Sequence, residues 1–180
     1  KFKNIIPPTL ITRSKKEIDR FMNSYKKSVI KPLYGNGGQG IFLLDKNDKN
    51  YNQIIEKFID EENTPFIWQK FLPEIIKGDK RIILVNGEPV AALKRIPKKN
   101  EFRSNIHVGG STKAVELSRN DRKICSIIKE TLISEKLFFV CIDIIGNYLT
   151  EINVTSPTCI QEIKKVHKID VAKIIFDRLG

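Results

Sequence analysis

The sequence predicts an α+β protein in which antiparallel hairpins pack against helices. Two observations lead to this class. Apolar residues with helical spacing recur in four separate segments, and short apolar runs flank the turn dipeptides Asn86-Gly87 and Gly146-Asn147. The sequence contains no internal repeat and no low-complexity tract, which excludes a solenoid and a linker-type protein.

Two helices and three strands are expected in the first part of the chain. Ser14 and Glu17 form a capping box ahead of apolar residues with helical spacing, which predicts a helix over 14–25. The same spacing predicts a second helix over 50–62. The strands expected here are the β-branched and apolar segments 28–33, 41–44 and 66–71.

Two hairpins and two further helices are expected after residue 80. The hairpin strands are 81–85 with 89–96, and 138–145 with 148–154. Ser118 is expected to cap a helix that ends near Lys136, and Asp170 a last helix to the C-terminus. Residues 97–115 are polar and contain glycine without any periodicity, so they predict a long loop of the kind that often serves as a lid.

The charge balance of the chain points first to an anionic partner. The 180 residues suit one domain or two small lobes that share a cleft. They include 32 Lys and Arg against 21 Asp and Glu, a formal net charge of +11. Much of the lysine occurs in scattered pairs such as Lys15-Lys16 and Lys164-Lys165. We therefore expect a solvated lysine surface and no nucleic-acid partner.

Several classes of protein are excluded by what the sequence lacks. No apolar run approaches the roughly 20 residues of a membrane span, and residues 1–13 have no continuous apolar core of a signal peptide. The three cysteines, Cys125, Cys141 and Cys159, are far apart and form no Cys-x-x-Cys pair. We expect no membrane association and a reducing, cytoplasmic setting.

A glycine-rich stretch lies between two expected strands. Residues 35–40 read Gly-Asn-Gly-Gly-Gln-Gly, and Lys31 lies near the end of the preceding strand. Glycines let backbone N–H groups approach an anion closely, and Lys31 adds positive charge. The stretch is not a P-loop, because Gly-Lys-Ser/Thr is missing and a strand follows. It predicts either a phosphate-binding loop or a glycine-rich hairpin turn.

Three oxygen-bearing side chains on the second hairpin predict a metal site. Glu151 and Asn153 share a face because they are two residues apart. A two-residue turn at Gly146-Asn147 would pair Asp143 with Thr150, whereas an odd-length loop would pair Asp143 with Glu151 and bring all three together. Carboxylate and amide oxygens suit Mg²⁺. The alternative is that the carboxylates face solvent on an exposed sheet.

Arginines gather around the first hairpin and the loop that follows it. Arg81 and Arg95 lie on opposite arms of the hairpin, and Arg103 lies in the loop. Arginine is suited to clamping carboxylate and phosphate groups. The alternative for each is an ordinary surface salt bridge.

Matching segments spread over most of the chain resemble one family. They are PTLITR at 8–13, IKPL at 30–33, GNGG at 35–38, GDKR at 78–81, VNGEPV at 85–90, RIP at 95–97, RSN at 103–105, GG at 109–110 and DIIG at 143–146. The most specific is LTEINVTSPTCI at 149–160. From about residue 5 to residue 163, the chain resembles the ATP-grasp portion of bacterial glutathione synthetases.

The resemblance implies an ATP-grasp fold of two α+β lobes with ATP bound between their antiparallel sheets. Residues 1–70 would form the small lid lobe and residues 71–180 the large catalytic lobe. The family's N-terminal substrate domain has no counterpart in these 180 residues, so we expect the chain to be a piece of a longer protein. The full-length family members are expected to be homo-oligomers.

The activity implied by the resemblance is the ATP-dependent ligation of glycine to γ-glutamylcysteine through an acyl-phosphate, with Mg²⁺ or Mn²⁺ as the metal. Alternatives are another ATP-grasp carboxylate–amine ligase and a non-catalytic fragment that binds Mg·ATP. The sequence departs from the family pattern at Ser111 and Gln161, where arginine is expected, and at Lys94, where a small residue is usual.

The resemblance also implies roles for individual residues. ATP phosphates would be bound by Lys31, Gly35, Asn36, Gly37, Gly38, Gln39 and Gly40. The adenine hinge would be Gln69, Lys70, Phe71 and Leu72, with Asp79 near the ribose. The reacting phosphoryl group would be stabilised by Arg81, Arg95 and Arg103, and residues 97–111 would form a lid. The metal ligands would be Asp143, Glu151 and Asn153.

Overall fold

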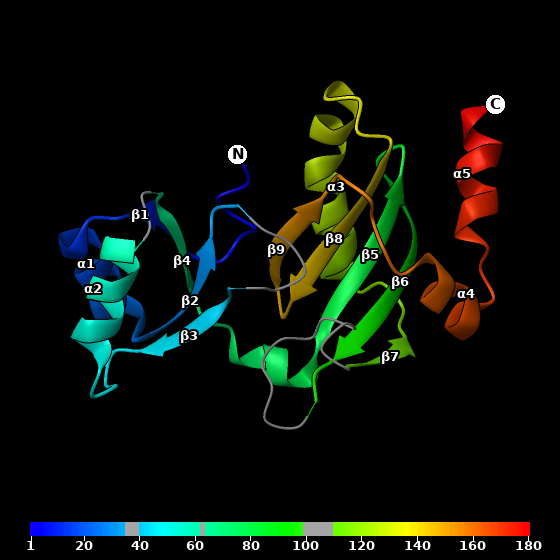
Figure 1. Cartoon of the computed structure of the whole chain (residues 1–180). Coiled ribbons are helices and arrows are strands. Elements are labelled where there is room, and N and C mark those ends of the chain that lie inside the picture. Colours follow the sequence, from blue (N-terminus) through cyan, green and yellow to red (C-terminus); the bar gives the residue numbers. More distant parts are fainter. Residues whose placement is uncertain (35–39, 62–63, 99–109) are drawn as a thin grey trace. The chain divides into compact units, whose positions relative to one another are not determined.

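The chain folds into two compact units. The computed structural model describes residues 1–34, 40–61, 64–98 and 110–180 (Figure 1). The smaller unit is Pro7–Leu72, and the larger unit combines Lys1–Ile6 with Pro73–Gly180. This division differs from the expected lobes, 1–70 and 71–180, at residues 1–6 and at residues 71–72. Ile5 is buried in the core of the larger unit, and its carbonyl oxygen accepts a hydrogen bond from Leu149 N–H at 2.8 Å.

The smaller unit is a four-stranded antiparallel sheet with two helices. Its strands are β1 (Thr9–Thr12), β2 (Lys27–Pro32), β3 (Phe42–Asp45) and β4 (Phe66–Lys70), in the order β1-β4-β2-β3. Helices α1 (Lys15–Tyr25) and α2 (Tyr51–Glu61) pack on one face of this sheet (Figure 1). Their apolar residues Met22 and Ile55 meet Ile30 and Trp68 from the sheet, all fully buried. The opposite face of the sheet is therefore free of these helices.

The larger unit is built on a five-stranded antiparallel sheet. The strand order is β7-β6-β5-β8-β9, with bounds β5 (Asp79–Val85), β6 (Glu88–Ile96), β7 (Ser111–Ala114), β8 (Phe139–Ile145) and β9 (Tyr148–Asn153). Its helices are η1 (Pro73–Lys77, a 3₁₀ helix), α3 (Arg119–Ser134), α4 (Ile160–His167) and α5 (Val171–Leu179). No helix among the described residues is long and apolar enough to cross a membrane.

Helices cover both faces of the larger sheet. On one face, α3 packs against Ile82 and Ile142, and on the other α4 and α5 pack against Ile83 and Cys141 (Figure 1). Because β5 is covered on both faces, its run from Ile82 to Val85 is apolar without alternation and has no exposed surface. The polar residues at the start of β5 are the exception, and they position the site described below.

Most of the expected elements are confirmed, including four helices and both hairpins. The first hairpin turns where Asn86 and Gly87 have φ of +51° and +74°, as a tight two-residue turn requires. The predicted capping box at Ser14 is only half present. Ser14 accepts from Glu17 N–H, but the Glu17 carboxylate accepts from the Thr12 hydroxyl instead of reaching Ser14 N–H.

Four short elements were not expected from the sequence, and one of them is the 3₁₀ helix η1. Strand β1 is only four residues long and pairs on one side only. Strand β7 lies inside the segment predicted as a loop over 97–115, where it adds an edge to β6. Helix α4 follows Cys159, which has a left-handed backbone and no side-chain cap, so the usual start signal is missing.

Candidate functional site

Two arginines and two aspartates meet on one face of the larger sheet. Asp79 and Arg81 are two residues apart on β5, so their side chains share a face. The strand register places Arg95 of β6 opposite Asp79, and Asp143 of β8 opposite Arg81. All four are buried, with exposed fractions between 1% and 8%. Isolated charges cannot be buried at this depth, so each must have a partner.

The hydrogen bonds within this group, which we call the Arg–Asp network, link all four residues. Arg81 donates from Nε and Nη2 to the two oxygens of Asp143 at 2.8 Å and 2.7 Å. Arg95 donates from Nε to Asp79 Oδ1 at 2.9 Å and also pairs with Asp79 Oδ2 through Nη2. The same Nη2 lies 2.9 Å from Asp143 Oδ2. Two positive and two negative charges thus balance in a fork-shaped arrangement typical of arginine and carboxylate.

The network determines the ionisation of its members. Burial opposes ionisation of Asp143, but hydrogen bonds and charge from Arg81 and Arg95 lower its pKa below the ordinary value. Burial likewise opposes the charge on both arginines, yet the carboxylates raise their pKa values above normal. Arg81, Arg95 and Asp143 are therefore charged at neutral pH.

A β-bulge brings Glu151 opposite Asp143. The turn at Gly146-Asn147 has two residues, and Ile145 pairs with Tyr148 as that length requires. The register then shifts between Asp143 and Ile144, so that Thr150 is the extra residue and its hydroxyl donates to Asp143 O at 3.1 Å. As a result Asp143 pairs with Glu151. Neither alternative considered from the sequence included a short turn followed by a bulge.

Asp143, Glu151 and Asn153 fit a divalent cation. Asp143 Oδ1 accepts one hydrogen bond within the described residues, which leaves a lone pair on a carboxylate oxygen. Asn153 is two residues from Glu151 on the same face, and its buried Nδ2 has no partner in the described part of the chain. The amide can therefore turn its oxygen to that side without breaking a bond there. These oxygens suit Mg²⁺ or Mn²⁺.

The described residues contain no cluster of three or more His, Cys, Asp or Glu of metal-binding type. The predicted ligand set is of a different kind, because only two of its three residues, Asp143 and Glu151, are acidic and the third is Asn153. The assignment therefore depends on the register of β8 and β9 and on the amide of Asn153.

Two residues near the network, Thr158 and Cys159, were given no role in the site from the sequence. Arg81 donates from Nη1 to the Thr158 hydroxyl at 2.5 Å and lies 3.8 Å from Cys159 Sγ. Neither residue is acidic, and both follow β9 in an irregular connection, so the residue types alone gave no signal of this contact. Burial raises the pKa of Cys141, two residues before Asp143, to about 11, while Arg81 acts in the opposite direction.

The smaller unit brings two of the predicted nucleotide residues together. Lys31 Nζ donates to Gln69 Oε1 at 3.1 Å, and Gln69 Nε2 donates to the Thr9 hydroxyl at 3.0 Å. Because Ile30 and Trp68 point toward the helices, Lys31 and Gln69 point from the opposite face. A cationic and an amide side chain therefore lie on the face that α1 and α2 do not cover.

The other nucleotide residues predicted in the smaller unit lie at the end of β4, at Gly40 or outside the described residues. Lys70 Nζ is 5.8 Å from the ring centroid of Tyr25, Phe71 N–H donates to Lys27 O at 3.1 Å, and Leu72 is buried. Gly40 is described, with φ +68°. Gly35, Asn36, Gly37, Gly38, Gln39 and Arg103 lie outside the described residues, as does most of the predicted lid over 97–111.

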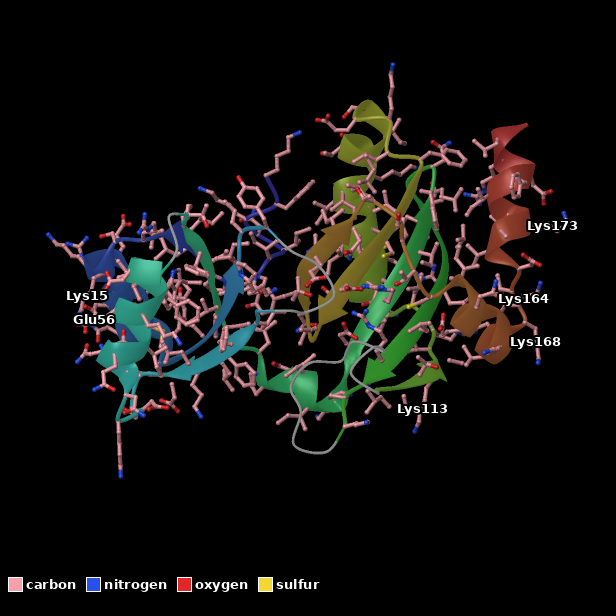
Figure 2. All side chains as sticks on the ribbon, viewed as in Figure 1. Lys15, Glu56, Lys113, Lys164, Lys168 and Lys173 are labelled. Carbon is pink, nitrogen blue, oxygen red and sulfur yellow. The ribbon has the colours of Figure 1, made fainter. Side chains whose placement is uncertain are left out.

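Several surface lysines form exposed ion pairs. Lys164 pairs with Asp170 and Lys173 with Asp177, both at 2.6 Å, and their side chains point outward from α4 and α5 (Figure 2). Lys15 of α1 is paired with Glu56 of α2 at 2.9 Å. Exposed pairs of this kind contribute little to stability. These lysines lie on solvated surface.

Comparison with known proteins identifies the family. Residues 1–168 match the family described as the ATP-grasp domain of prokaryotic glutathione synthetase. The chain belongs to this family. Curated glutathione synthetases from Agrobacterium fabrum and Buchnera aphidicola are each 46% identical to it over 99% of its length, and that from Synechococcus elongatus is 45% identical over 94%. The chain spans about half the length of these relatives, 53% to 56%.

Solved structures confirm the ATP-grasp fold. The ATP-grasp ligase PsnB, complexed with the precursor peptide PsnA2 and AMPPNP, aligns with 97% of this glutathione synthetase ATP-grasp domain and 52% of its own chain, at a TM-score of 0.71 and 18% identity. The D-cycloserine synthetase DcsG aligns with 98% of the domain and 66% of its own chain, at a TM-score of 0.72 and 10% identity. At these identities the likeness concerns the fold alone.

The departures from the family pattern fall outside the four residues of the Arg–Asp network, although Lys94 is next to Arg95 on β6. In this ATP-grasp domain, Ser111 begins β7 opposite Ile96, and Lys94 pairs with Lys113. Gln161 is exposed in the first turn of α4. None of these three replaces a residue of the network.

Proposed function

We propose that this chain is the nucleotide-binding part of an ATP-dependent carboxylate–amine ligase that joins glycine to γ-glutamylcysteine. The observation that carries the proposal is the buried Arg–Asp network next to Glu151 and Asn153, in a chain of the glutathione synthetase ATP-grasp family. The curated relatives that share 42% to 46% identity with it are glutathione synthetases.

The proposed reaction has two steps. A carboxylate oxygen of γ-glutamylcysteine attacks the γ-phosphorus of ATP, so that an acyl-phosphate forms and ADP leaves. The amine of glycine then attacks the acyl carbon, releasing inorganic phosphate and a proton as the amide forms. Phosphoryl transfer of this kind depends mainly on positioning and on stabilising the charge of the phosphoryl oxygens.

The residues of this chain supply positioning and charge. Asp143, Glu151 and Asn153 would hold Mg²⁺ or Mn²⁺, which when bound neutralises and orients phosphate oxygens. Among the described residues, Arg95 engages its neighbours through Nε and Nη2, and its Nη1 would donate to a phosphoryl or carboxylate oxygen. Arg81 holds Asp143 in place from the other side.

Residues of the smaller unit, together with Asp79 and Arg103, complete the proposal. Lys31 would contact the phosphates with the loop over 35–40, and Gln69 to Leu72 would contact adenine. Asp79 would lie near the ribose, and its ion pair with Arg95 would at the same time fix that guanidinium. Arg103 and the segment 97–111 would close over the reacting groups.

The setting and the assembly are proposals of the same kind. All three cysteines are free thiols buried in the larger unit, which supports a reducing, cytoplasmic setting. The partners we propose are small molecules, with no nucleic acid and no membrane. The complete protein would be a homo-oligomer.

A binding and product assay tests the proposal. Isothermal titration with AMPPNP in the presence of MgCl₂ should show one site per chain. γ-Glutamylcysteine, glycine and ATP should give glutathione and phosphate in equal amounts, measured by mass spectrometry and phosphate release. Formation of glutathione, without product from other acids or amines, would support the substrate assignment. Phosphate release only with a different acid and amine would contradict it, and nucleotide binding without any product would identify a non-catalytic Mg·ATP-binding domain.

A further inference from the structure

We propose that Thr158 is a positioning residue, whose hydroxyl fixes the guanidinium of Arg81 and through it the carboxylate of Asp143. The inference rests on the proposed function, since it concerns the affinity of the site for a metal–nucleotide complex. It begins from the nitrogen atoms of Arg81. Nε and Nη2 are directed at the two oxygens of Asp143, so the remaining nitrogen, Nη1, is the third point at which the guanidinium can be held.

Thr158 provides the oxygen that Nη1 contacts. The Nη1–Oγ1 distance is 2.5 Å, whereas the other neighbour of Nη1, Cys159 Sγ, is 3.8 Å away. Sulfur is a weak acceptor, so the Thr158 hydroxyl is the stronger of the two contacts. Its own proton can be directed to Cys159 Sγ at 3.7 Å. The hydroxyl therefore holds the third corner of a guanidinium whose other two nitrogens hold Asp143.

The main chain next to Thr158 is held in place by the residue that follows it. Cys159 is buried, with φ +81°, and immediately precedes helix α4. Thr158 itself is exposed. It thus reaches from solvent to a buried arginine, and the hydroxyl can be removed without opening a cavity in the core.

The consequence concerns the orientation of a metal ligand. Residues that hydrogen-bond to a ligand carboxylate fix its direction, and their loss typically weakens metal binding about tenfold or more. Here the chain of contacts runs from Thr158 to Arg81 to Asp143. Without the hydroxyl, Arg81 can turn toward Cys159 and Asp143 loses its fixed bidentate partner.

Thr158→Val tests the inference, because valine keeps the shape of threonine without its hydroxyl. Thr158→Ser restores a hydroxyl. Thr155→Val is a matched control, because Thr155 is an exposed threonine of the same connection and makes no side-chain hydrogen bond within the described residues. Titrating MgCl₂ with AMPPNP into each protein by calorimetry should give a dissociation constant about tenfold higher for Thr158→Val only. Thermal unfolding of each protein should be measured in parallel.

Several results would overturn the inference. Unchanged affinity in Thr158→Val would do so, and so would a lowered unfolding temperature with unchanged affinity, since that is the signature of a merely structural contact. Equal weakening in Thr155→Val would show a general effect of the connection. If the unsubstituted chain binds no Mg·AMPPNP, the proposed function fails and the inference falls with it.

Discussion

Replacing Asp143 with asparagine removes the carboxylate that contacts both buried arginines, Arg81 and Arg95. Three N–H groups lie 2.7 Å to 2.9 Å from its oxygens, and the residue itself is 1% exposed. An asparagine side chain at this position could accept through one oxygen only, and its NH₂ group would face the guanidinium groups. Removing one partner of a buried ion pair leaves an uncompensated charge, which costs about 3–5 kcal/mol.

The stability loss is measurable in the larger unit alone. Cys125, Cys141 and Cys159 are all buried there, so the rate at which a thiol reagent labels them in urea reports the opening of that unit. In the Asp143→Asn protein the free energy of opening the larger unit should fall by about 3 kcal/mol, so the unit should open at a lower urea concentration. Trp68 belongs to the smaller unit, so its fluorescence serves as an internal control.

Glu151→Gln separates stability from metal binding. Glu151 lies opposite Asp143 but is exposed and outside the Arg–Asp network. Its substitution should weaken Mg·AMPPNP binding while leaving the urea profile nearly unchanged. The Asp143→Asn substitution should weaken Mg·AMPPNP binding and also lower the stability in urea. If Asp143→Asn opened at the same urea concentration as the unsubstituted chain, the argument that Asp143 balances the two arginines would be refuted.

The pH dependence follows from the lowered pKa of Asp143. Its folded-state pKa lies below the unfolded value of about 3.9. The contribution to stability is therefore complete above that unfolded pKa and is lost as pH falls through the folded pKa. Urea midpoints between pH 2 and pH 7 should show an acid loss of stability that is smaller in the Asp143→Asn protein.

Three further outcomes are expected. Ser118→Ala removes the cap that accepts from Asp121 N–H, and should lower the unfolding free energy by about 1 kcal/mol in urea titrations. Lys31→Met should weaken AMPPNP binding about tenfold if Lys31 contacts phosphate, whereas Lys16→Met, at an exposed position on α1, should not. Burial raises the pKa of the Cys125 thiol to about 11. Its alkylation should therefore be slow at pH 8 and become faster as the pH approaches 11. Rapid labelling at pH 8 would contradict the burial of this thiol.

Local patterns predicted the elements that carry strong signals of their own. Ser118 starts α3 with a complete capping box, and Asn86-Gly87 forms the two-residue turn that its residue types favour. Alternation placed Glu151 and Asn153 on one face. These features depend on residues close in sequence, and sequence reasoning is most reliable there.

The Arg–Asp network depends on pairings that sequence reasoning could not establish. Asp79 and Arg95 were assigned to different roles, ribose and phosphoryl group, yet the structure pairs them directly. No glycine or proline marks the bulge at Thr150. Threonine is a common residue of regular strands, so its presence does not indicate a bulge. Thr158 was noted only as one position of a family motif, because its contact with Arg81 joins two segments that are distant in sequence, the connection after β9 and strand β5.

The bulge at Thr150 has a consequence for the length of the second hairpin. In an antiparallel hairpin a slip of one residue turns the side chains of a strand to the opposite face, so the register is strongly specified wherever one face is buried. Here a slip of one residue would turn Glu151 and Asn153 toward α3 and Thr150 and Ile152 toward the arginines. Insertions and deletions between residues 144 and 151 should therefore occur only in compensating pairs, so that the spacing of this hairpin is constrained even where its residue types are free to vary.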